Sequence, residues 1–131
     1  MSHRAFADRF LAALRAGDTA SMAETIHPDF ELVEAESLPY GGTYRGLAGW
    51  QALTQAVGAT FAGFRLDLLD YAGEGEDTLV LHFAISGRGR RSGTPFESRV
   101  LEYWRFLDGK LVRIDPFYFD THLIVGAIGA T

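Results

Sequence analysis

Apolar residues in the N-terminal half of the chain recur with the spacing of a helix. One stripe predicts a first amphipathic helix and consists of Phe6, Phe10, Ala13 and Leu14. Gly17 favours the left-handed conformation that ends a helix, and Asp18 favours the N-cap of a second helix, which Pro28 stops. After a glycine-rich loop over residues 37–46, a third helix is predicted by the stripe of Trp50, Leu53, Val57 and Phe61.

Beyond Gly63 the period of the pattern changes from helical to two, which is typical of strands. The expected strands are Phe30 to Ala35 and then 64–71, 78–86, 96–107 and 110–119. Asp108-Gly109 is a strong hairpin signal between the last two. Helices followed by an antiparallel meander predict an α+β fold with the helices on one face of the sheet. No repeat or linker interrupts residues 1–131, which we expect to form a single domain.

Alternation along the last two strands separates an inner from an outer row of side chains. Charges mark the outer row of strand 96–107, so its inner row is Phe96, Ser98, Val100, Glu102, Trp104 and Phe106. Arg113 and Asp115 mark the outer row of the last strand, so its inner row is Val112, Ile114, Pro116 and Tyr118. The inner rows are almost wholly apolar, and Glu102 is their one carboxylate.

Glu102 is therefore the strongest candidate for a functional group. A carboxylate on a core-facing row either stays protonated, with a raised pKa, or is held by hydrogen-bond donors. Perturbed carboxylates in clefts are enriched at active sites, which favours an acid–base role. The alternative is a structural Glu102 that pairs with an inner tyrosine or histidine and only stabilises the core.

The outer rows keep more apolar residues than a solvent-facing surface usually shows: Leu101, Tyr103, Leu111, Phe117 and Phe119. This excess predicts a homodimer in which the outer faces of two sheets pack together. Partial cover of the sheet by the C-terminal tail is the alternative.

Composition narrows the function classes. Seventeen acidic and twelve basic residues give a net charge of −5, which disfavours binding to nucleic acid and to anionic membranes. The chain has no cysteine, and charges interrupt the apolar residues near its N-terminus, so we expect a cytoplasmic protein without a signal peptide or membrane span. The four histidines lack metal-ligand spacing, and no phosphate-binding or dinucleotide motif occurs, so neither metal nor cofactor is expected.

Several short motifs resemble the nuclear transport factor 2-like superfamily, and above all its SnoaL-like and ketosteroid isomerase-like branch. They are Ala16-Gly17-Asp18, His27-Pro28-Asp29-Phe30, Thr43-Tyr44-Arg45-Gly46, Glu102-Tyr103-Trp104-Arg105-Phe106 and Asp108-Gly109-Lys110-Leu111-Val112. The resemblance covers nearly the whole chain. It implies a cone-shaped, curved antiparallel sheet with three N-terminal helices on its concave face, as in cystatin-like folds. The fold itself hosts many functions.

Carrying the family's functional residues across gives a mixed result. In ketosteroid isomerases a proton-shuttling Asp falls at the position of Ala35, with Glu34 and Glu36 pointing the other way. The tyrosine of their oxyanion hole matches Phe10, which cannot donate a hydrogen bond, whereas their protonated Asp matches Glu102. The resemblance therefore disfavours steroid isomerisation.

SnoaL-like cyclases and limonene epoxide hydrolases place a catalytic Asp on the last strand, where this chain reads Asp115-Pro116-Phe117-Tyr118. The inward position there is Pro116, and Asp115 would face inward only if a bulge reversed the alternation. Epoxide hydrolysis also needs two inward carboxylates around a water, and Glu102 is the one that the pattern indicates.

His82 has two possible orientations. The bulkier set Leu79, Leu81, Phe83 and Ile85 would point inward by pattern and leave His82 outside, at the surface or at a dimer interface. The alignment with ketosteroid isomerase turns His82 inward, where it could form an acid–base couple with Glu102. We follow the alignment here, because the neighbouring strands also carry apolar outer rows.

These observations lead to an expected function. We expect an internal pocket that binds a small apolar molecule, with contacts from Phe10, Ala35, Tyr40, Trp50, Val100, Trp104, Ile114 and Pro116. If the protein is an enzyme, the expected chemistry is cofactor-free proton transfer on a carbonyl compound, of the isomerase, cyclase or dehydratase type. The catalytic candidates are then Glu102, His82 and Tyr118. The alternative is a non-catalytic ligand-binding or dimerisation module of the same fold.

Overall fold

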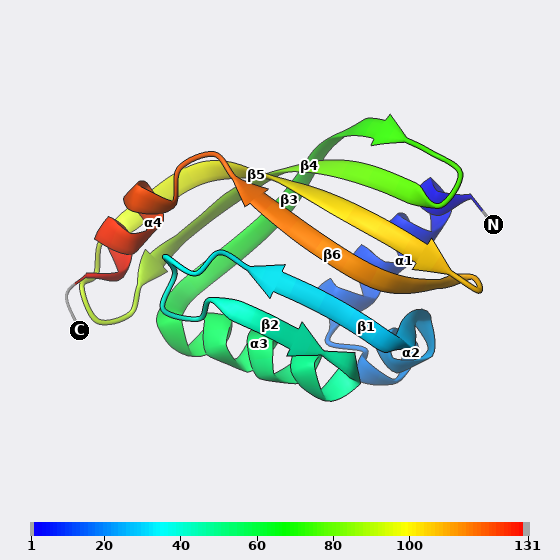
Figure 1. Cartoon of the computed structure of the whole chain (residues 1–131). Helices are drawn as coiled ribbons and strands as arrows, with labels where there is room; N and C mark the ends of the chain where they lie inside the picture. The colour runs from blue at the N-terminus through cyan, green and yellow to red at the C-terminus, as the bar shows by residue number, and fades with distance from the viewer. Residues whose placement is uncertain (1, 130–131) are drawn as a thin grey trace.

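The computed structural model describes residues 2–129 (Figure 1). Its elements follow the predicted order except that residues 42–45, expected within a loop, form a short strand. The helices are α1 (His3–Ala16), α2 (Thr19–Thr25), α3 (Gly46–Thr60) and α4 (Thr121–Ile128). The strands are β1 (Ile26–Glu34), β2 (Gly42–Arg45), β3 (Phe61–Glu74), β4 (Thr78–Gly89), β5 (Pro95–Leu107) and β6 (Lys110–Tyr118). The predicted α+β fold is thereby confirmed.

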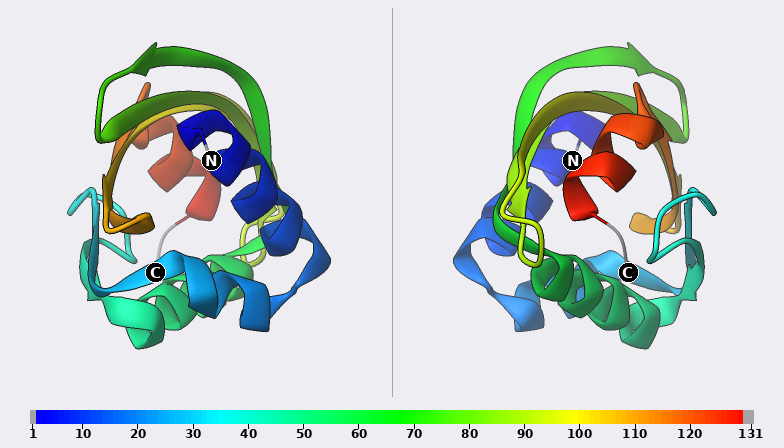
Figure 2. Two further views of the ribbon diagram at one scale, coloured as in Figure 1. Left: turned by 90° about the vertical axis from the view of Figure 1, so that its right-hand side faces the viewer. Right: turned by 90° about the vertical axis from the view of Figure 1, so that its left-hand side faces the viewer.

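The strands form one curved sheet in the order β2-β1-β6-β5-β4-β3. All neighbouring strands are antiparallel except β1 and β6, which run parallel and make the sheet mixed. Figure 2 shows the sheet curling around α1 and α4, while α3 lies across the open side of this curve. This arrangement encloses the inner rows of β1, β5 and β6 between sheet and helices.

Local signals begin and end the elements where the pattern predicts. Gly17 adopts a positive φ of 67° and ends α1, and the Asp18 side chain caps α2 by accepting a hydrogen bond from Ser21 N at 3.1 Å. Asp108 and Gly109 both have positive φ, 52° and 73°, as the tight turn between β5 and β6 requires. These positions need no tertiary contact to be recognised.

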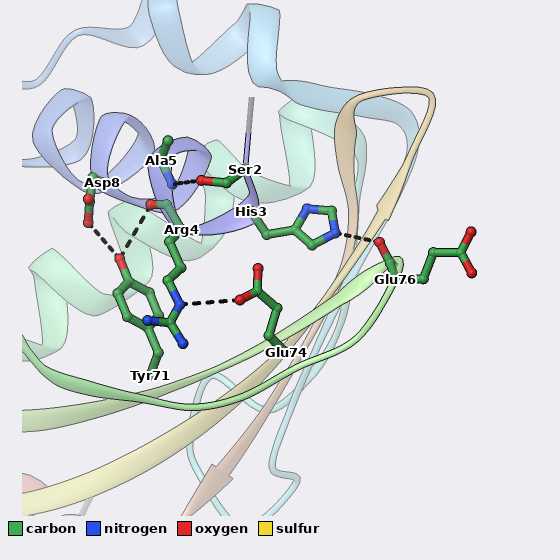
Figure 3. A network of polar contacts seen from close by, with 8 residues as sticks. All are labelled: Ser2, His3, Arg4, Ala5, Asp8, Tyr71, Glu74 and Glu76. Atoms are coloured by element: carbon green, nitrogen blue, oxygen red, sulfur yellow. Dashed lines mark hydrogen bonds and ion pairs between the residues drawn. The ribbon is translucent and has the colours of Figure 1, made fainter.

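A polar network attaches the N-terminal end of α1 to β3 and its hairpin with β4 (Figure 3). The Tyr71 hydroxyl donates a hydrogen bond to Asp8 Oδ1 at 2.6 Å, and Arg4 Nε lies 3.3 Å from Glu74 Oε1. His3 Nε2 lies 2.6 Å from the carbonyl oxygen of Glu76, and the His3 ring stacks on Phe106. With this end held at the sheet edge, the apolar stripe of α1 faces into the curve of the sheet.

On the last strand, one apolar residue lies on the other face from the one expected. Leu111, assigned to the outer row, is fully buried. The cause is an irregularity in the pairing of β5 with β6, where Arg105 pairs with Arg113 but Phe106 pairs with Leu111, so that Val112 has no partner. The extra residue reverses the alternation locally and turns Leu111 inward.

Helix α4 follows the last strand and begins at Asp120, whose side chain accepts a hydrogen bond from Leu123 N at 3.1 Å. It packs against β4 and β5 inside the curve of the sheet and buries Ile124, Ala127 and Ile128 (Figure 2). The outer face is therefore left uncovered by α4, and Phe117 and Phe119 remain 63% and 72% exposed. None of the helices within residues 2–129 has the length and apolar character needed to cross a membrane.

Candidate functional site

A cavity of about 840 Å³ lies between α1, α3 and the inner face of the sheet. Apart from Ala35, all the residues expected to contact a ligand line it: Phe10, Tyr40, Trp50, Val100, Trp104, Ile114 and Pro116. The cavity lining also includes Arg15, Thr54 and Arg65, which are exposed side chains on α1, α3 and β3. The cavity therefore opens to solvent between these three elements and is closed at the sheet by β1, β5 and β6.

Glu102 lies on the inner row of β5 and faces the cavity. Trp104, two residues further on the same row, donates its indole N–H to Glu102 Oε1 at 2.9 Å. Burial raises the pKa of the Glu102 carboxyl to about 7, the Trp104 hydrogen bond opposes this rise, and the nearby charge of Glu34 adds to it. Glu102 thus holds a proton over a pH range in which an exposed glutamate is ionised.

Glu34 is a second carboxyl in the same cavity, and sequence analysis missed it. It is 5% exposed and lies at the end of β1, where the Tyr118 hydroxyl donates a hydrogen bond to its Oε1 at 2.6 Å. Burial raises the pKa of Glu34 to about 7, although the Tyr118 hydrogen bond favours the ionised form. Phe30, Leu32 and Glu34 alternate inward along β1, so strict period-two counting from Phe30 would have identified Glu34.

The expectation that Ala35 contacts a ligand in the cavity is also wrong. β1 ends at Glu34, and the next residue turns into the loop, where the Ala35 carbonyl accepts a hydrogen bond from Leu38 N at 3.0 Å. Ala35 does not line the cavity. The inward position that the family alignment assigned to Ala35 is occupied by its neighbour Glu34.

Two tyrosines complete a polar cluster with Glu34. Tyr118 lies on the inner row of β6, and Tyr40 comes from the loop before β2; both line the cavity, as Glu34 does. Burial and the adjacent charge of Glu34 hold the pKa of both hydroxyls above the ordinary value for tyrosine. Both therefore stay protonated hydrogen-bond donors, and Tyr44 supports the loop by donating to the Tyr40 carbonyl at 2.7 Å.

Strand register places the two carboxyls on either side of Pro116. Leu32 on β1 pairs in parallel with Ile114 on β6, so Glu34 is level with Pro116, which pairs with Glu102 on β5. Because neighbouring strands lie about 4.8 Å apart, the Cα atoms of Glu34 and Glu102 are about 10 Å apart. Glu34 and Glu102 therefore face the cavity with an apolar proline ring between them, whereas Asp67, the third acidic residue of the lining, is paired with Arg65 on β3.

Asp115 has no part in this arrangement. The pairing of β5 with β6 is regular around Pro116, so no bulge turns Asp115 inward. Its carboxylate instead accepts two hydrogen bonds from the Arg113 guanidinium, at 2.8 and 2.9 Å, outside the cavity. The aspartate that the cyclases and epoxide hydrolases use on this strand has no counterpart in the cavity.

The inward orientation expected for His82 is also wrong. On β4, Leu79, Leu81, Phe83 and Ile85 are buried, and His82 faces the other side, where its Nδ1 lies 3.0 Å from Asp70 Oδ1. Burying four bulky apolar side chains stabilises the fold far more than burying one imidazole, which decides the orientation. His82 pairs across strands with the exposed Leu101, whereas Glu102 pairs with Leu81, so His82 and Glu102 lie on opposite faces.

The polar groups of the cavity support acid–base chemistry. Each carboxyl has a neutral donor on one oxygen, and among residues 2–129 no Lys, Arg or His forms an ion pair with either. Repulsion between two acids in one apolar site favours the state in which one is ionised and the other protonated. In the same part of the chain, no group of three or more acidic or histidine side chains could hold a metal ion.

Comparison with known proteins gives a consistent result for the family. A model of the SnoaL-like domain matches residues 7–114. An NTF2-like protein of Burkholderia thailandensis has 32% sequence identity over 92% of both chains, with a TM-score of 0.83. No curated protein matches the chain.

Two further crystal structures are similar. TerC, co-crystallised with polyporic acid, is 27% identical over 92% of this chain and 93% of its own, with a TM-score of 0.81. An NTF2-like protein of unknown function from Burkholderia pseudomallei, 22% identical over 99% of this chain and 100% of its own, has the same fold with a TM-score of 0.85. With the domain match spanning most of its length, the chain belongs to the SnoaL-like domain family.

Proposed function

We propose that this protein binds a small, mostly apolar carbonyl compound and catalyses a cofactor-free proton transfer on it. The observation that carries the proposal is the pair of carboxyls, Glu34 and Glu102, that face one apolar cavity with neutral hydrogen-bond donors as their partners. Such a pair supplies a base and an acid at the same pH. The TerC structure, crystallised with polyporic acid, supports small-molecule binding in this fold.

Glu34 is the proposed base. The Tyr118 hydroxyl stabilises its ionised form and holds one oxygen at 2.6 Å, which leaves the other oxygen for substrate. The Glu34 carboxylate removes a proton from the carbon next to the substrate carbonyl, and the electron pair of that C–H bond moves toward the carbonyl oxygen. Returning the same proton to a different carbon completes an isomerisation without a net change of protons.

Glu102 is the proposed hydrogen-bond donor to the developing enolate oxygen. The charge on Glu34 keeps Glu102 protonated, because ionising both acids in one cavity is unfavourable. A donor placed where negative charge develops contributes about 10²- to 10³-fold to the rate. The requirement for one ionised and one protonated carboxyl leads us to expect a bell-shaped pH profile centred near pH 7.

Hydrogen–deuterium exchange next to the carbonyl of simple aryl ketones, followed by NMR in D₂O, tests the proposal. Glu34→Gln should slow the catalysed exchange by about 10²- to 10⁴-fold, because it removes the base. Glu102→Ala should slow it by about 10²-fold, because it removes the donor. Glu97→Gln changes an exposed carboxylate on the other face of β5 and should exchange at the wild-type rate. Equal exchange by wild type and Glu34→Gln would contradict the assignment.

A non-catalytic binding module is the second candidate. Phe10 and Pro116 line the cavity where the ketosteroid isomerases and the cyclases carry polar groups, and this observation favours binding without turnover. Ketone binding without any catalysed exchange in the same experiment would support this candidate against the enzyme.

We also propose that two copies of the chain associate through the outer face of the sheet. Leu101, Phe117 and Phe119 are 40%, 63% and 72% exposed on that face. A second copy would cover them by packing sheet against sheet.

A further inference from the structure

A second, smaller hollow adjoins the cavity and shares part of its lining. This outer groove has a volume of about 200 Å³ and lies where α1, α2 and α3 meet; Gly17, Met22, Leu47 and Gln51 are among its walls. Leu14, Trp50 and Thr54 line both spaces. The wall between cavity and groove is therefore one side chain deep.

Trp50 is the largest part of this wall. Its indole, from α3, meets the edge of Phe10 on α1 at 5.4 Å between ring centres and that of Phe30 on β1 at 6.2 Å. Thr54 follows one turn later on the same side of α3, and its hydroxyl donates back to the Gln51 carbonyl at 2.9 Å. The wall is thus mostly apolar, and the Thr54 hydroxyl donates its proton within its own helix.

Trp104, the second tryptophan of the chain, is held more firmly than Trp50. Trp104 is 1% exposed, and its N–H donates to Glu102, so both packing and a hydrogen bond determine its position. Trp50 is half-buried, and within residues 2–129 its indole N–H has no hydrogen-bond partner. Trp50 is therefore held by packing without a side-chain hydrogen bond.

We propose that Trp50 is the partition that sets how long a ligand the cavity accepts, and that the groove behind it takes the apolar tail of a longer ligand once the indole is removed. This inference rests on the proposed function, because it places the carbonyl of the ligand at the carboxyls and its tail toward α1 and α3. The groove adds room for a short alkyl chain or a single phenyl ring. Trp50 is then a specificity-determining residue, distinct from the acid–base pair.

Calorimetric titration with phenyl n-alkyl ketones, from acetophenone to dodecanophenone, tests this role. Each methylene that becomes buried should strengthen binding by about fourfold. In the wild type this gain should stop at the length at which the tail reaches Trp50. In Trp50→Ala the gain should continue over several more methylenes, so that the ratio of long-chain to short-chain affinity rises at least tenfold.

Three further variants make the result specific. Leu14→Ala opens the same wall from α1 with both tryptophans intact and should move the length limit in the same direction, even if Trp50→Ala fails to fold. Trp50→Phe keeps an aromatic ring and should move the limit less. Gln51→Ala alters only the outer groove and should keep the wild-type limit.

The possible failures differ from one another. If the wild type binds ketones and both Trp50→Ala and Leu14→Ala keep its length limit, the partition is disproved while the proposed function stands. If ketones of every length fail to bind to the wild type and to all variants, both proposals fail. If binding follows the expected lengths but ketone exchange is absent, Trp50 keeps its role and the catalytic proposal fails.

Discussion

The two faces of the sheet treat their acidic groups in opposite ways. On the outer face, Asp115 accepts two hydrogen bonds from Arg113, and Asp70 lies 3.0 Å from His82. On the inner face, Glu34 and Glu102 receive hydrogen bonds only from a tyrosine hydroxyl and an indole N–H. Outer acids thus lie beside basic side chains, whereas burial raises the pKa of the inner acids. Ionising the inner pair is therefore costly for the folded protein, which points to a functional reason for its presence.

The largest expected difference between the faces concerns packing. Trp104 is 1% exposed on the inner row of β5 and packs edge-on against Phe10 at 5.3 Å. Trp104→Ala should lower the free energy of unfolding by about 3–5 kcal/mol, because it leaves a cavity and an unpaired Glu102. Urea denaturation measures the change. A loss below about 1 kcal/mol would show that the inner row is not the core.

The inner acids should make stability fall as pH rises. Both carboxyls have a folded-state pKa of about 7 against an ordinary value of 4.5, so the folded protein binds more protons between these limits. The stability that comes from this extra proton binding is fully present below about pH 4.5 and is lost as pH rises through 7. Each shift corresponds to about 3 kcal/mol if the carboxyl titrates alone. Denaturation curves between pH 5 and pH 8.5 measure the effect.

Substitution should remove this pH dependence. Glu34→Gln/Glu102→Gln should match the wild type at pH 5 and exceed its stability at pH 8.5, because the amides carry no charge to desolvate. Glu36→Gln, an exposed neighbour on the loop after β1, is the matched control and should follow the wild-type curve. Parallel curves for the wild type and the double variant would mean that the two carboxyls titrate as exposed groups do.

The smallest expected effect on folding comes from the outer face. Phe117 is 63% exposed, so Phe117→Ser should change the stability of the isolated chain by less than about 0.5 kcal/mol. The same change should abolish the proposed dimer by removing its apolar centre. Sedimentation equilibrium then gives the mass of one chain for the variant and of two for the wild type. A wild type that sediments as a monomer at all concentrations would refute sheet-to-sheet association.

The fold could be predicted because its signals are local. Apolar spacing indicated the helices, Gly17 and Asp18 marked a helix boundary, and Asp108-Gly109 marked the last hairpin. The inward position of Glu102 followed from alternation alone, since the three charged residues of the other row mark the outer face of β5. The inward position of Leu111 could not be predicted in this way, because a single unpaired residue in β6 reverses the alternation without a sequence signal of its own.

The composition of the site depended on long-range pairing. Glu34 becomes part of it through Tyr118, a residue 84 positions away, and through the parallel pairing of β1 with β6 that aligns Glu34 with Pro116 and Glu102. By contrast, alternation along β4 alone indicated the outward orientation of His82, because the bulkier apolar set is the buried one, and following the family alignment was the mistake.

Local patterns were thus enough for the α+β class, for most of the elements in their order and for the inward position of Glu102, because periodicity and turn residues act within a few positions of the chain. That Glu34 lies level with Glu102 across Pro116, and that Trp50 lines two adjoining hollows, emerged from the packed structure. Each of these depends on which strands and helices become neighbours. That choice is made by burying apolar surface over the whole chain, and short patterns do not record it.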